Sequence, residues 1–79
     1  MATATLTQRL TSCPTPDGQF SVENPEHHNG RTVCADLTEA AAFAAISSGF
    51  HPGMHVHVFD DHGRVVGWVR DGVGHGAVA

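Results

Sequence analysis

Apolar and polar residues alternate with a period of two in several short stretches of the chain, which is the pattern of half-buried β-strands. Gln8 interrupts the apolar face of the first stretch, whereas Phe20 and Val22 share the inner face of the second. The pattern predicts strands over residues 4–12, 19–24, 31–35, 54–59 and 64–70.

Residues typical of turns separate these stretches. Residues 14–18 contain two prolines and an Asp-Gly pair. Further on, Pro25 cannot donate to a ladder, and Asn29 with Gly30 favours a positive φ. Gly63 suits the tight connection between the last two strands. Short connections of this kind predict a β-meander in the first part of the chain and a closing hairpin.

One segment, residues 37–48, has helical periodicity. Asp36 is placed to cap the amide of Glu39, and the Glu39 side chain can reach back in a capping box. Gly49 is expected to end the helix. The fold class is therefore α+β, an antiparallel four- to five-stranded sheet with one helix packed on one face, in the order β-β-β-α-β-β.

Three bulky apolar residues of the helical region, Phe43, Ile46 and Phe50, fall on one side at helical spacing. We expect them to be core residues that hold the helix on the sheet. Ile46→Ala is then expected to destabilise the fold by roughly 2–4 kcal/mol. A groove for a partner helix is the alternative.

The register of the closing hairpin has two solutions, and His55 and His57 share a face in both. A four-residue loop leaves Trp68 and Val66 on this histidine face. A three-residue loop with a bulge moves them to the side of Val56.

A His-x-His pair on one strand presents two imidazoles side by side, and this raises the question of a metal site. His51, His62 or His75 would have to complete the ligand set around His55 and His57. No Cys-x-x-Cys or His-Glu-x-x-His motif accompanies the pair. We expect a solvent-facing polar strand with no metal, and a metal-binding or sensor module is the alternative.

A chain of 79 residues is expected to form a single domain, residues 1–79, whose Gly-rich residues 71–79 are interpreted as a flexible tail. Four arginines, no lysine and eight acidic residues give a formal net charge of −4. Phosphate binding needs clustered cations, so direct nucleic-acid binding is disfavoured. A protein partner with a basic surface fits this charge better.

Cys13 and Cys34 follow no leader of signal-peptide form, and no apolar run is long enough to span a bilayer. We expect a cytoplasmic protein in which both thiols are reduced and buried, the alternatives being a disulfide or a reactive thiol. No phosphate loop, cofactor motif or nucleophile-base spacing is present, so we expect no enzyme activity and no cofactor.

The acidic residues gather at the predicted loops. Glu23 and Glu26 flank the second turn, and Asp60 and Asp61 form the hairpin tip. These four residues, with Trp68 as an aromatic anchor if it points outward, are the predicted partner-binding residues.

The plan of a short acidic chain with a meander (ATLTQRLTS, QFSVEN, RTVCA), one Ala-rich helix (LTEAAAFAAISS) and a closing hairpin (HVHVFDDHGRVVGWV) resembles the small phage-encoded anti-CRISPR proteins. The resemblance covers architecture, size and charge over residues 4–70 and carries no residue motif. It implies an inhibitor that binds a CRISPR effector complex, of the type I Cascade kind, in the host cytoplasm and blocks its binding of target DNA.

The same plan also resembles small β-β-α-β-β domains of bacteria. A third class stays open beside the inhibitor and the metal module. This is an accessory domain that self-associates, for example as a homodimer, through a sheet edge or Trp68.

Overall fold

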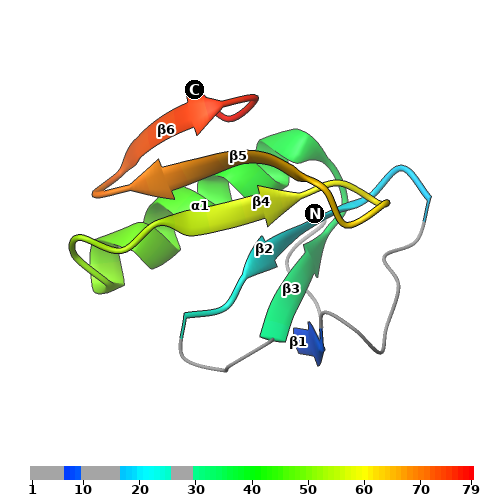
Figure 1. Ribbon diagram of the computed structural model, residues 1–79, viewed down its shortest axis with the longest axis horizontal. Coiled ribbons are helices and arrows are strands. Elements are labelled where there is room, and N and C mark those ends of the chain that lie inside the picture. The colour runs from blue at the N-terminus through cyan, green and yellow to red at the C-terminus, as the bar shows by residue number, and fades with distance from the viewer. Residues whose placement is uncertain (1–6, 10–16, 26–29) are drawn as a thin grey trace.

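The structure is a computed structural model that describes residues 7–9, 17–25 and 30–79. In these residues, six strands form one antiparallel sheet and one helix packs across a single face of it (Figure 1). This confirms the α+β class and the helix position, but the sheet has six strands rather than four or five. The elements are β1 (Thr7–Arg9), β2 (Phe20–Glu23), β3 (Gly30–Cys34), α1 (Leu37–Phe50), β4 (Val56–Phe59), β5 (Val65–Arg70) and β6 (Val73–Gly76).

The strand order is β1-β3-β2-β4-β5-β6, with every neighbouring pair antiparallel. The pairing of β2 with β4 joins the first three strands to the last three, and Val22 lies opposite Val58 in that ladder. Figure 1 shows α1 behind the sheet and β6 along its upper edge. Of the predicted first strand, Thr7–Arg9 form β1, and its other residues lie outside the described ones. Residues 14–16 of the first predicted turn and residues 26–29 after Pro25 also lie outside them.

The sixth strand lies in the segment predicted to be a flexible tail. Asp71 and Gly72 both have positive φ, 50° and 81°, and Arg70 pairs directly with Val73. This is the geometry of a two-residue hairpin turn, for which Asp-Gly is a preferred sequence. The turn is held on the helix, because the Gly72 amide donates to Ser48 Oγ at 2.9 Å. The tail prediction is therefore wrong, since residues 73–76 extend the sheet.

The helix begins as predicted and ends later. Asp36 Oδ1 accepts from the Glu39 amide at 2.8 Å, and Glu39 Oε1 accepts from the Ala35 amide at 2.6 Å. The predicted stop at Gly49 is wrong, because α1 runs on to Phe50 and His51 is its C-cap. Pro52 ends the helix instead, since proline excludes the helical conformation from the residue before it.

The face of α1 that lies against the sheet is made of small residues. Ala40, Ala44 and Ser48 are fully buried, whereas Ile46 is 62% exposed and Phe50 is 77% exposed. The predicted core role of Ile46 and Phe50 is therefore wrong, and Phe43 alone of the three bulky residues packs partly on the core. Small side chains at spacings of four let the helix approach the sheet closely and leave bulkier ones on its flank. The core they cover consists of Val22, Cys34, Val56, Val58 and Val69.

Candidate functional site

The β4–β5 hairpin places Trp68 on the sheet face that points away from α1, which we call the open face. Trp68 lies directly opposite His57 in the ladder, and directly opposed residues share a face. The pairing shifts at a bulge next to Phe59, and Val66 packs partly buried against the core. Each predicted register is thus right in part. Trp68 lies on the histidine face, as the register with a four-residue loop predicts. Val66 lies on the side of Val56, as the register with a three-residue loop and a bulge predicts.

Trp68 contacts two histidines, and the three rings form what we call the His–Trp cluster. The His75 ring stacks on the indole with ring centroids 3.9 Å apart and planes 17° apart, and the His55 ring meets it edge-on at 4.3 Å. His75 comes from β6, where it pairs directly with Trp68. Both imidazoles are exposed and the indole is half-buried. The cluster therefore presents aromatic surface to solvent on three adjacent strand segments.

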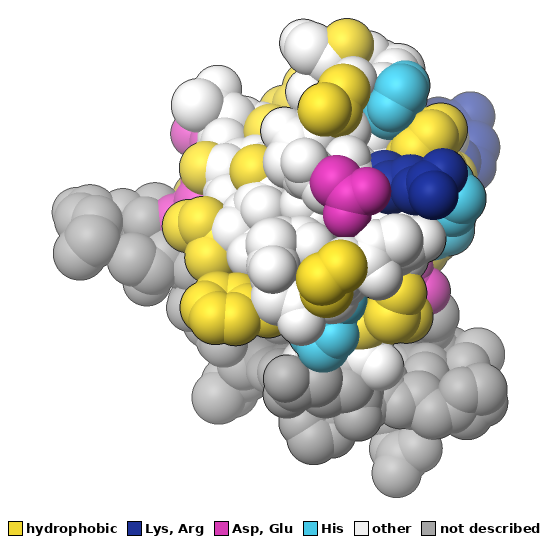
Figure 2. Space-filling model, turned by 90° about the vertical axis from the view of Figure 1, so that its left-hand side faces the viewer, with side chains coloured by type: hydrophobic (Ala, Val, Ile, Leu, Met, Phe, Trp, Pro, Cys, Tyr) yellow, Lys and Arg dark blue, Asp and Glu magenta, His cyan; other side chains and the backbone are white. Residues whose placement is uncertain are grey.

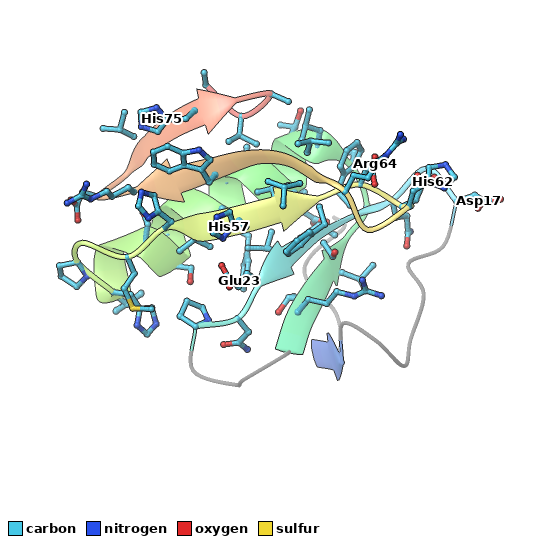
Figure 3. All side chains as sticks on the ribbon, in the orientation of Figure 1. Asp17, Glu23, His57, His62, Arg64 and His75 are labelled. Carbon is cyan, nitrogen blue, oxygen red and sulfur yellow. The ribbon has the colours of Figure 1, made fainter. Side chains whose placement is uncertain are left out.

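A carboxylate–imidazole pair continues this arrangement across the sheet. Glu23 Oε1 accepts from the His57 backbone amide at 3.2 Å and lies 2.8 Å from His57 Nδ1. An ionised carboxylate oxygen can only accept a hydrogen bond, so Nδ1 is the donor when the carboxylate is the acceptor of this pair. Glu23, His57 and His75 lie along one row from β2 to β6, with α1 behind the sheet (Figure 3).

The acidic residues of the β4–β5 turn hold the turn itself. Asp60 Oδ1 accepts from the amides of His62 and Arg64, both at 2.9 Å, and Asp60 Oδ2 lies 3.1 Å from Arg64 Nε. The bond from the Arg64 amide is the main cause that lowers the pKa of the Asp60 carboxyl. Asp61 Oδ2 accepts from the Gly18 amide at 2.7 Å and so ties this turn to the one before β2. Both acids are largely covered by these contacts.

The structure separates the predicted partner-binding residues into two groups. Glu23 and Trp68 belong to the open face and are linked through His57. Asp60 and Asp61 lie at the hairpin tip, where Figure 3 shows His62 and Arg64 at the other end of the sheet from His75. The fifth residue, Glu26, lies outside the described residues.

Sequence reasoning considered His75 only as a possible metal ligand and missed its contact with Trp68, because His75 lay in the supposed tail. The signal was present, since Trp68 and His75 are equally spaced from the Asp-Gly pair at positions 71 and 72. A hairpin centred on that pair places them opposite each other.

His55, which directly precedes β4, and His57 within it do share a face, with ring centroids 6.2 Å apart. Among the side chains that the structure describes, no group of three or more His, Cys, Asp or Glu residues is arranged to hold a metal ion.

Cys34 is a free thiol buried in the core between helix and sheet. Burial, followed by the negative charges of Glu39 and Asp36, raises the pKa of this thiol to about 11. The thiolate is the reactive form, so Cys34 is protonated and unreactive near neutral pH.

A groove of about 240 Å³ lies between α1 and the end of β2. Its apolar wall comes from the flank of the helix and its polar end from the strand. The lining residues are Glu23, Asn24, Phe43, Ile46, Ser47, Phe50 and His51. Figure 2, which views the end of the molecule where α1 terminates, shows hydrophobic side chains exposed over this side.

No protein-family model, curated protein sequence or solved structure shows significant similarity to this chain. In the part of the chain that the structure describes, no helix is both long enough and apolar enough to cross a membrane.

Proposed function

We propose that this protein acts by binding another protein through the open face of its sheet, with Trp68 as the central contact. The observation that supports this is the position of Trp68, the one tryptophan of the chain. It lies half-buried in the exposed His–Trp cluster rather than in the core between helix and sheet. Tryptophan is among the residues most enriched at the energetic centres of protein interfaces.

The surroundings of Trp68 favour this role because they restrict its movement. Its strand pairs on both sides, with β4 and with β6, and both neighbouring histidine rings contact the indole. A side chain that is already held in place loses little conformational entropy when a partner covers it.

The partner is expected to carry a basic surface, because the protein has a net charge of −4. A CRISPR effector complex of the type I Cascade kind is the specific partner that the resemblance in size, charge and element plan suggests. In that form of the proposal, the protein inhibits by covering the basic path along which the effector binds target DNA. The attraction would come from overall charge and from Glu23 on the open face, because the carboxylates of Asp60 and Asp61 accept hydrogen bonds that hold the hairpin tip.

The test is the affinity of a purified Cascade complex for the protein and for Trp68→Ala, with Val65→Ala as the control. Val65 is an exposed residue at the other end of the same strand. We expect Trp68→Ala to weaken binding by about 2 kcal/mol or more, the scale of an interface hot spot, and Val65→Ala to leave it unchanged. Equal binding by both variants would contradict the role of the open face. No binding of the unchanged protein to Cascade would contradict the CRISPR form of the proposal.

A further inference from the structure

The groove beside α1 has an apolar wall that the fold does not use. Ile46 and Phe50 are mostly exposed, and the helix–sheet core is already filled by small helix residues and by the valines of the sheet. Large apolar side chains gathered in one hollow, rather than scattered, are typical of contact sites. The groove lies beside α1 and shares Glu23 with the open face, but none of its lining residues belongs to the His–Trp cluster.

One end of this groove carries a carboxylate. Glu23 lines it, and the described lining residues include no arginine. Both hydrogen bonds to Glu23 from His57 end on Oε1, and the buried Arg31 lies directly opposite Glu23 in the β2–β3 ladder. The Arg64 and Arg70 side chains lie beside Asp60 and Asp71 instead. Among the residues that line the groove, Glu23 is the acidic one, and it adjoins the apolar wall.

The size of the groove limits what it can hold. Its volume of about 240 Å³ is below the roughly 300–1,000 Å³ of sites for cofactors and drug-sized molecules. A space of this size, open along one side, suits one or two side chains of a peptide segment.

We propose that this groove binds a peptide segment of a partner protein in which an apolar side chain is followed closely by a lysine or arginine. The apolar side chain packs on Phe43, Ile46 and Phe50. The cationic side chain lies with its alkyl part along the same wall and its charge against the Glu23 carboxylate.

A titration of the isotope-labelled full chain with a short blocked peptide, acetyl-Leu-Ala-Ala-Arg-amide, tests this by NMR. We expect saturable shifts of the Ile46 methyl and Phe50 ring signals. A matched peptide with Gln in place of Arg should bind about two- to fivefold more weakly, as expected for loss of a partly exposed ion pair. Glu23→Gln should cause the same loss for the Arg peptide and none for the Gln peptide. Asp17→Asn, which removes a charge at an exposed turn, should change neither.

A second pair of variants tests the apolar wall. Ile46→Ser should weaken peptide binding by roughly tenfold, because one large apolar contact is lost, whereas Val65→Ser, a similarly exposed valine on β5, should have no effect. Both positions are on the surface, so both variants are expected to fold. The proposal is overturned if no saturable shifts occur at about 10 mM peptide, well above the ~1 mM dissociation constant expected of such a small contact. Equal binding of the Arg and Gln peptides, or shifts centred on Trp68 instead, would also overturn it.

Discussion

Trp68 and His75 stack face to face across the β5–β6 ladder, with ring centroids 3.9 Å apart. This contact joins the last strand to the rest of the sheet through side chains as well as backbone. It also fixes one side of the indole on the open face, where we propose that a partner binds.

Removal of the stacked imidazole should be visible in the emission of Trp68. His75→Ala is expected to shift the fluorescence to longer wavelength, because the indole loses a neighbour and gains water. It should also destabilise the fold by about 0.5–1.5 kcal/mol, the scale of an aromatic pair. The chain has one tryptophan and no tyrosine, so the signal reports this residue alone. His62→Ala, at the far hairpin tip, is the control, and an equal spectral shift in that variant would contradict the assignment.

The small-residue face of α1 predicts opposite effects for two substitutions on the same helix. Ile46→Ala should change the free energy of unfolding by less than about 0.5 kcal/mol, because the side chain is mostly in water. Ala44→Leu should destabilise by roughly 1–3 kcal/mol or more, because the fully buried Ala44 leaves no room between helix and sheet. Urea unfolding measures both. A large loss for Ile46→Ala with a small one for Ala44→Leu would mean that the helix is rotated.

The buried thiol of Cys34 predicts a loss of stability in alkali. Its pKa is about 11 in the folded chain against an ordinary value of 9.0. The folded state therefore keeps a proton that the unfolded state releases, and stability falls as the pH rises from about 9 to about 11. The chain has no lysine and no tyrosine to titrate in this range. The free energy of unfolding, measured at a series of pH values across this range, should fall with pH for the unchanged protein and much less for Cys34→Ala. The same slope in both would contradict the burial of this thiol.

The contacts of Asp60 predict that the stability of the hairpin tip depends on this carboxylate. Asp60→Ala removes an acceptor for two backbone amides and for Arg64 Nε, so it should lower the melting temperature more than Asp17→Ala does. The pKa of Asp60 is lowered on folding, so its contribution is present above the ordinary value of 3.8 and is lost as the pH falls below it. Equal melting temperatures for the two variants at neutral pH would contradict this role.

The sequence was sufficient for the features set by local chemistry. The capping box of Asp36 and Glu39, the turn at Gly63 and the shared face of His55 and His57 all follow from spacing over a few residues. Which side of α1 is buried does not follow in this way. Helical spacing places Phe43, Ile46 and Phe50 together, but the sheet accepts the smaller side chains, and this depends on how closely the two layers approach.

The sequence predicts the candidate site only in part, because the site depends on how separate strands pair. The outward position of Trp68 depended on a hairpin register with two solutions, and the bulge beside Phe59 combines them. The pairing of Glu23 with His57 joins strands from separate hairpins, so no short-range pattern encodes it. The position of His75 opposite Trp68 could have been predicted, because the Asp-Gly pair between β5 and β6 is a recognised hairpin turn sequence.

The most direct measurement of the central claim uses Trp68 itself as the probe. With 5-fluorotryptophan incorporated, the chain carries a single fluorine label, on the open face. We predict that addition of purified Cascade shifts or broadens this fluorine NMR signal in proportion to the complex formed, and that His75→Ala alters the bound signal as well as the free one. Complex formation with the fluorine signal unchanged would show that the partner binds elsewhere, and would contradict the open face as the binding surface.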